Sequence, residues 1–149
     1  IYIDDTFRRT IAGDLRMQTS FLAQELIKEN KMDSAVNVIN LCMDSIPKAT
    51  APYDYFSFEL TQMYYEAKAF KQGNKYAKEI FNQYEGDLTY YRTLDKDNQT
   101  YYGRSIQECE EVMERLQYIA QESNQTDVAK ELKDKIDGMV KTGVFQQMR

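Results

Sequence analysis

The sequence predicts an all-α protein built from antiparallel helical hairpins, and three observations support this prediction. Apolar residues recur every three or four positions along nearly all of the 149 residues, which is the spacing of one helix face. Two prolines and six glycines leave little of the turn chemistry that a sandwich or barrel requires. Apolar residues form 42% and charged residues 29% of the chain, as in ordinary globular proteins. We therefore expect about six helices in three hairpins, forming a single domain over 11–149 that follows a short segment over 1–10.

The first hairpin is predicted from two apolar runs with a polar break between them. The first run comprises Ala12, Leu15, Thr19, Leu22, Ala23 and Leu26. Asn30-Lys31 interrupts the run, and Asp33 is a suitable N-cap for the next helix. The second run comprises Ala35, Val36, Ile39, Cys42, Met43 and Ile46, and it ends before Pro47. Two amphipathic helices joined by so short a turn are expected to pack antiparallel.

The second hairpin is expected after a loop over 47–52, because Pro52 suits the first turn of a helix. Its first helix carries Phe56, Leu60, Met63, Tyr64 and Ala67. Gly73-Asn74 is interpreted as a stop followed by a cap. The second helix carries Ala77, Ile80, Phe81, Tyr84, Leu88 and Tyr91, and Gly86 is a candidate bend or end.

The third hairpin is expected after a break and cap from Asp95 to Asn98. Its first helix carries Tyr102, Ile106, Cys109, Met113, Leu116 and Ala120. A last helix is expected from near Thr126, with Ala129, Leu132, Ile136 and Met139 on its apolar side. Gly138 and Gly143 predict a frayed end.

The first hairpin resembles a tetratricopeptide repeat (TPR), whose helix pairs recur every 34 residues or so. The TPR pattern is matched by Leu22-Ala23, Leu26, Ala35, Ile39, Cys42 and Pro47. The second hairpin matches through Leu60, Tyr64, Ala77 and Phe81, with extra residues from Ala69 to Gly73. The third departs from the pattern, with Lys133 at an apolar position. The resemblance implies a short right-handed solenoid, and an irregular helical bundle is the alternative.

Several kinds of catalytic and metal site are excluded by the residue types present. The sequence has no histidine, so Ser–His–Asp and Cys–His sites cannot form within it. The glycines are scattered and make no phosphate-binding loop. Cys42 and Cys109 are too distant for a metal motif, so we expect buried thiols, with one disulfide as the alternative. No cofactor is expected.

Acidic residues outnumber basic residues in the chain. This excess bears on which partners the chain can bind and on whether carboxylates could act as catalysts. The net charge of −5 argues against nucleic acid as a partner, and no apolar run approaches the roughly 20 residues that span a bilayer. Four glutamates crowd one predicted helix: Glu108, Glu110, Glu111 and Glu114. We interpret them as a solvated helix face, and a small carboxylate-based enzyme is the less favoured alternative.

A peptide groove is the candidate binding site. In TPR arrays the groove is lined by first-helix positions that point away from the partner helix. These positions are Gln24, Lys28, Tyr55, Phe58, Gln62, Tyr65 and Tyr118. An exposed Phe58–Tyr65 strip would suit a peptide, although Tyr55 and Tyr65 fit a core equally well. The pairs Tyr90-Tyr91 and Tyr101-Tyr102 must each place one ring off the core face.

A second resemblance rests on short segments before Leu94. They are Ile1-Tyr2-Ile3-Asp4-Asp5-Thr6-Phe7-Arg8-Arg9, Phe21-Leu22-Ala23-Gln24-Glu25-Leu26-Ile27, Cys42-Met43, Ile46-Pro47, Pro52-Tyr53-Asp54-Tyr55, Tyr64-Tyr65 and Leu88-Thr89-Tyr90-Tyr91. Together they resemble the C-terminal tail of a family of large multi-pass bacterial membrane proteins of unknown function, which is similar to protein O-mannosyltransferases.

This resemblance implies that 1–10 join an upstream membrane domain and that the chain lies on the periplasmic side of the inner membrane. The chain would then be a non-catalytic module that recognises a polypeptide or braces its own membrane domain, without entering the bilayer. A purely structural role is the alternative. In isolation the end near Phe7 and Ile11 is expected to support a weak homodimer.

Overall fold

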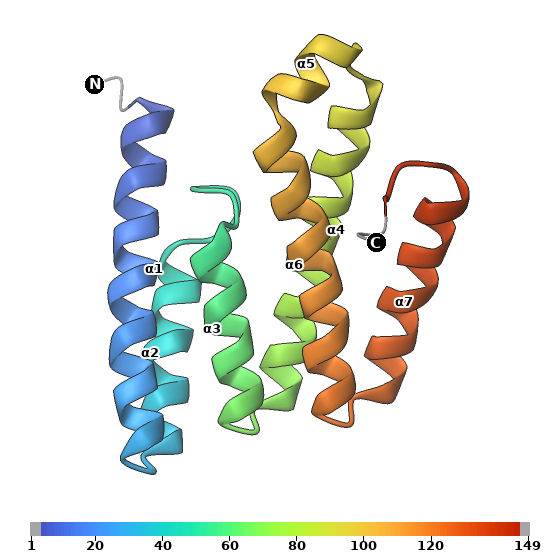
Figure 1. Ribbon diagram of the computed structural model, residues 1–149. Coiled ribbons are helices and arrows are strands. Elements are labelled where there is room, and N and C mark those ends of the chain that lie inside the picture. The colour runs from blue at the N-terminus through green and yellow to red at the C-terminus, as the bar shows by residue number, and fades with distance from the viewer. Residues whose placement is uncertain (1–3, 147–149) are drawn as a thin grey trace. The chain divides into compact units, whose positions relative to one another are not determined.

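The computed structural model describes residues 4–146, which form seven helices and no strand (Figure 1). The helices are α1 (Asp5–Lys28), α2 (Met32–Ser45), α3 (Tyr55–Glu66), α4 (Phe70–Thr93), α5 (Lys96–Tyr101), α6 (Gly103–Glu122) and α7 (Thr126–Lys141). The all-α class is confirmed. Within the described residues, no helix has the length and apolar character needed to cross a membrane. The chain divides into two compact units, one ending at Gly73 and the other beginning at Asn74. The expected single domain over 11–149 stays a prediction.

In the first unit, α1 and α2 form an antiparallel hairpin, and α3 packs against α1 (Figure 1). Helix α1 begins at Asp5, capped by the Asp4 carboxylate, which accepts from the Thr6 backbone N–H at 3.2 Å. Residues 5–10 of the expected N-terminal segment are therefore part of α1. Helix α2 begins at Met32, so Asp33 lies in its first turn and is not its cap.

The same turn closes three helices, and in each case a residue in the left-handed region follows the helix. These residues are Asn30 (φ 59°), Lys68 (φ 60°) and Asn124 (φ 59°). After α1, the Lys31 N–H donates to the Leu26 carbonyl at 2.8 Å, which satisfies a carbonyl that the helix end leaves free. The equivalent bonds after α3 and α6 have the same pattern. Each turn starts the next helix within a few residues, so all three expected helix–turn–helix connections are present.

Helix α3 begins later than the sequence analysis placed it. Its first residue is Tyr55, and Asp54 and Ser57 form a reciprocal capping box at its start. Pro52 therefore precedes the helix instead of opening it. Helix α4 begins at Phe70 and runs to Thr93, so the interpretation of Gly73-Asn74 as a stop was wrong, and Gly86 does not end the helix.

Gly73 is inside α4, and the absence of a side chain at this position leaves room for the Tyr65 ring. A Cβ added at Gly73 would lie 3.2 Å from the ring of the buried Tyr65, whereas a Cβ at Gly86 would meet nothing within 4 Å. We expect Gly73→Ala to lower the free energy of unfolding by about 1 kcal/mol through overpacking. Gly86→Ala, in the same helix, should raise it by up to about 1 kcal/mol through helix propensity. Urea unfolding of both variants measures the difference, and equal stabilisation by the two would contradict the argument.

The buried face of α1 includes only Ala12 and Ala23 of the apolar run that the sequence analysis assigned to the core. The buried residues are Ala12, Arg16, Ser20 and Ala23, whereas Leu15 and Leu22 are exposed. Three of the four are small, which lets neighbouring backbones come close. The fourth, Arg16, is 1% exposed and donates to backbone carbonyls of the 46–52 segment and to the Asp54 carboxylate.

In the second unit, α6 and α7 pack together as a hairpin. The predicted apolar stripes are buried except for Tyr102, which precedes α6 and is exposed. The buried residues are Ile106, Cys109, Met113, Leu116 and Ala120 in α6, and Ala129, Leu132, Ile136 and Met139 in α7. Ion pairs Lys78–Glu131 (2.8 Å) and Lys135–Glu85 (3.7 Å) link α4 to α7. The short α5 was not expected, and it makes seven helices in residues 4–146 where the sequence analysis expected about six.

Candidate functional site

The candidate peptide groove is not open at its two central aromatic residues. Phe58 is 0% and Tyr65 5% exposed, so the expectation that they form an exposed strip was wrong. Helix α3 buries Ser57, Phe58, Leu60, Thr61, Tyr64 and Tyr65, which is more than one stripe, so it is covered on more than one side. The Tyr65 ring lies 6.4 Å from that of Phe70 and next to Gly73. Burial also raises the pKa of Tyr65 to about 12.

The other predicted groove residues are exposed or half-buried. Gln24 and Lys28 are exposed, and the Lys28 ammonium pairs with Glu25 at 2.8 Å. Gln62 is half-buried, as is Tyr55, whose ring lies 5.8 Å from that of Phe58. Tyr118 is exposed and belongs to the second unit.

The first unit carries an exposed apolar surface on α1, and two of its residues, Leu15 and Leu22, were assigned to the core by the sequence analysis. We name it the α1 apolar face: Phe7, Ile11, Leu15, Phe21 and Leu22, each between 42% and 58% exposed. Spacings of four, four and seven residues place the first three and Leu22 along one side of the helix, with Phe21 beside them. The signal was present in the sequence, because this apolar series begins at Phe7, before the residues that we assigned to the first helix.

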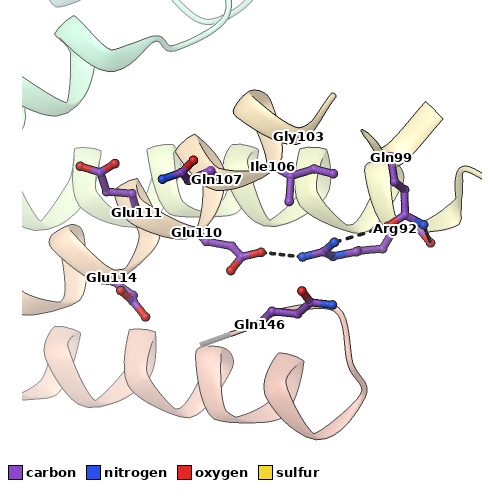
Figure 2. Close-up of a pocket in the computed structure, with 9 residues that line it drawn as sticks. All are labelled: Arg92, Gln99, Gly103, Ile106, Gln107, Glu110, Glu111, Glu114 and Gln146. Carbon is purple, nitrogen blue, oxygen red and sulfur yellow. Dashed lines mark hydrogen bonds and ion pairs between the residues drawn. The ribbon is translucent and has the colours of Figure 1, made fainter. Parts of the chain in front are cut away.

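The second unit contains a pocket of about 360 Å³ (Figure 2). It is lined by Arg92, Gln99, Gly103, Ile106, Gln107, Glu110, Glu111, Glu114 and Gln146. These residues come from α4, α5, α6 and the segment after α7. The pocket therefore lies where four parts of the unit meet.

Arg92 holds these parts together. Its Nη2 donates to Glu110 Oε1 at 2.6 Å, and its Nε donates to the Val144 carbonyl at 2.8 Å (Figure 2 shows the first bond). Its Nη1 lies 3.4 Å from Gln99 Oε1. The arrangement satisfies a guanidinium that is mostly removed from water.

Glu110 is buried, so its interpretation as part of a solvated face was wrong. Burial raises the pKa of its carboxyl, while Arg92 and a backbone N–H of Gln146 lower it. Glu108 and Glu111 are exposed, and Glu114 is half-buried in the pocket wall. Three carboxylates and one guanidinium give the pocket wall a net negative charge when all are ionised, which favours a cationic group over an anionic one.

The described residues hold no group of three or more His, Cys, Asp or Glu side chains placed to bind a metal ion. Cys42 and Cys109 are free, buried thiols. Burial raises the pKa of Cys109 to about 12, which makes its thiol a weak nucleophile.

Comparison of the chain with protein-family models, curated proteins and solved structures finds no match. The resemblances to TPR proteins and to the multi-pass membrane family therefore rest on the sequence motifs alone.

Proposed function

We propose that this chain is a non-catalytic protein-interaction module that docks through the α1 apolar face. Five large apolar side chains on one helix are each about half exposed. Water contact with such surface costs about 25 cal/mol per Å², and contiguous apolar patches on soluble proteins commonly mark interaction sites. The fold does not need these side chains, because the core side of α1 is made by other residues.

The partner surface is expected to be an apolar helix face flanked by basic residues. A straight helix presenting apolar side chains at four- and seven-residue spacings suits helix-on-helix packing. Asp14 lies seven residues from both Phe7 and Phe21, and Glu25 lies three residues from Leu22. Both carboxylates are on the same side of α1 as the apolar face; Glu25 already pairs with Lys28, so Asp14 is the one that lysine or arginine on the partner would complement.

Docking is favoured over recognition of an extended peptide in the candidate groove. The groove required Phe58 and Tyr65 at the surface, and both are buried. A brace role, with the α1 apolar face packed on the protein's own membrane domain, fits the same observation. A carboxylate-based enzyme has weaker support, because Glu108 and Glu111 are exposed and Glu110 is already bonded to Arg92.

A TPR-like solenoid is the proposed arrangement of the hairpins. It is supported by the packing of α1 against both α2 and α3, the order found when repeats stack, and by the common turn after α1, α3 and α6. A parent protein of the glycosyltransferase type and a periplasmic location are further parts of the proposal, and they rest on the family resemblance.

Photo-crosslinking tests the docking proposal in the complete protein, within the organism that makes it. A photoreactive phenylalanine replaces Leu15, and a matched control places it at Lys130, an exposed position of α7. We expect Leu15 to yield one reproducible polypeptide adduct, identified by mass spectrometry, at least about tenfold above the Lys130 level. The adduct should disappear when Ile11→Gln and Leu22→Gln are added, and these exposed substitutions should change stability by less than about 0.5 kcal/mol. Equal labelling at Leu15 and Lys130 would contradict the docking proposal.

A further inference from the structure

Two segments of the second unit have the sequence Asn-X-Thr, in which X is not proline. This is the acceptor pattern for attachment of a glycan to an asparagine side chain. The first segment is Asn98-Gln99-Thr100, inside α5, and the second is Asn124-Gln125-Thr126, which joins α6 to α7 (Figure 1). The pattern also occurs by chance, so the surroundings of each asparagine decide whether it can act as an acceptor.

The second segment is exposed at the two residues that the acceptor pattern specifies. Asn124 and Thr126 are both exposed, and Gln125 between them is half-buried. The Gln125 side chain accepts from the Asn74 side-chain amide at 2.8 Å and donates to the Ser123 carbonyl at 3.2 Å. The acceptor amide and the hydroxyl therefore lie on either side of an anchored residue, and both are accessible from solvent.

The Asn124 side chain is not used by the fold. Backbone groups close this turn, because the Asn124 N–H donates to the Gln121 carbonyl at 3.0 Å and the Gln125 N–H to the Ala120 carbonyl at 2.9 Å. Among the described residues, the Asn124 carboxamide has no hydrogen-bond partner. Asparagine suits this position because it tolerates the φ of 59°. The side-chain nitrogen can therefore be modified without the loss of a native bond.

Asn98 is exposed as well, but its side chain is engaged. Its Nδ2 donates to Asp95 Oδ2 at 2.8 Å, and its backbone N–H donates to Asp95 Oδ1 at 2.9 Å, so both groups belong to the cap of α5. The whole segment is helical, whereas the acceptor pattern is used in surface loops. Modification of Asn98 would compete with the α5 cap.

The charge two residues before each asparagine also differs. Glu122 holds this position before Asn124, and Lys96 holds it before Asn98. Glu122 is exposed, and in the part of the chain that the structure describes its carboxylate forms no ion pair. A basic group of a transferase can therefore pair with Glu122, whereas Lys96 would repel it.

The acceptor turn lies between two helix ends. Glu122 is the last residue of α6, and Thr126 is the first residue of α7. Residues at helix ends open at a lower free-energy cost than residues at helix centres. A transferase can therefore draw this segment into its own site without unfolding the unit.

We propose that Asn124 is the attachment site of an N-linked glycan, transferred from a polyprenyl-diphosphate-linked oligosaccharide. Asn124 Nδ2 forms a bond to the anomeric carbon of the first sugar, and the bond from that carbon to the diphosphate oxygen breaks. The polyprenyl diphosphate leaves with the electron pair, and the amide gives up one proton to a base of the transferase. The modification requires the periplasmic location proposed above, where such donors are presented in bacteria, and it is independent of the α1 apolar face.

Peptide mass spectrometry of the complete protein, purified from the organism that makes it, tests this proposal. Trypsin separates the two asparagines, because cleavage after lysine and arginine gives the peptides 97–104 and 116–130. We expect peptide 116–130 to carry an added mass of whole sugar residues, with an occupancy at least about tenfold above that of peptide 97–104. Fragmentation that retains the glycan should place it on Asn124.

Variants made in the same organism test the chemistry. Asn124→Gln and Thr126→Ala should abolish the added mass, whereas Thr126→Ser, which keeps the hydroxyl, should retain it. Asn98→Gln is the matched control and should leave the added mass unchanged. An unmodified peptide 116–130, or an added mass that persists in Asn124→Gln, would overturn the proposal. The Leu15 crosslinking result depends on neither outcome, so failure of docking and failure of glycosylation are distinguishable.

Discussion

Arg16→Met is expected to lower the free energy of unfolding by about 3 kcal/mol, one of the two largest effects we anticipate. The Arg16 side chain is 1% exposed and donates to the Pro52 carbonyl at 2.7 Å, the Ala51 carbonyl at 3.1 Å and Asp54 Oδ2 at 3.1 Å. Methionine occupies similar space without donors. The variant would leave these acceptors without their charged partner, which costs more than the net value of the bonds themselves.

The loss of stability in Arg16→Met should be centred on the loop before α3. Residues 46–52 are not helical, and the carbonyls of Ile46, Ala51 and Pro52 converge on one guanidinium. Arg16→Lys keeps the charge but replaces the planar fork by a single ammonium, so we expect an intermediate loss. Arg9→Met, an exposed change in the same helix, should alter stability by less than about 0.5 kcal/mol. Urea unfolding of the three variants gives the comparison. An Arg16→Met chain as stable as Arg9→Met would show that the guanidinium is not needed.

The core-facing side of a helix could be predicted where the helix carries a single apolar stripe. In α6 and α7 one face is apolar at helical spacing and the opposite face is charged, so periodicity alone identifies the core side. The turns after α1 and α6 were also marked in the sequence, because asparagine tolerates the left-handed conformation that closes each helix.

Helix α1 could not be oriented from the sequence. Five of its large apolar residues are exposed, while Ala12, Ser20 and Ala23 face the core together with a buried charge. That charge is stabilised by carbonyls at 46–52, which lie 30 to 36 residues away in the sequence. Local periodicity contains no information on such distant acceptors, so a rule that places leucine inside and arginine outside gives the wrong face.

The candidate site could be predicted from the sequence only in part, for a similar reason. The groove positions assumed that one side of α3 stays open, yet Phe58 and Tyr65 are covered by the rest of the chain. The Arg92–Glu110 pair joins residues 18 apart through the unexpected helix α5. The tyrosine pairs were visible in the sequence, but their contact depends on how α5 turns the chain between α4 and α6.

The other large expected effect concerns the reactivity of Cys109. Burial raises the pKa of this thiol from 9.0 to about 12, with smaller contributions from the carboxylates of Asp87, Glu108 and Glu110. At pH 8 a thiol of pKa 9.0 is about one-tenth thiolate, whereas at pKa 12 the fraction is about one in ten thousand. Alkylation by iodoacetamide should therefore be about a thousandfold slower in the folded chain than in the urea-unfolded chain. A Cys42→Ala background makes Cys109 the only reporter, and mass spectrometry measures the rate.

The same shift predicts how stability depends on pH. Because the pKa is higher in the folded state, the folded chain retains this proton when the unfolded chain has lost it. The contribution of the Cys109 thiol to the free energy of unfolding is fully present below pH 9. It disappears as pH rises from about 9 towards 12. Tyr65, whose pKa is raised from 10.0 to about 12, acts in the same direction over the upper part of that range. Cys109→Ala should flatten the decline between pH 9 and 10, where tyrosine ionisation contributes least. A native alkylation rate within tenfold of the unfolded rate, or an unchanged pH profile in Cys109→Ala, would mean that solvent reaches the thiol and that α6 is less closely packed at this point.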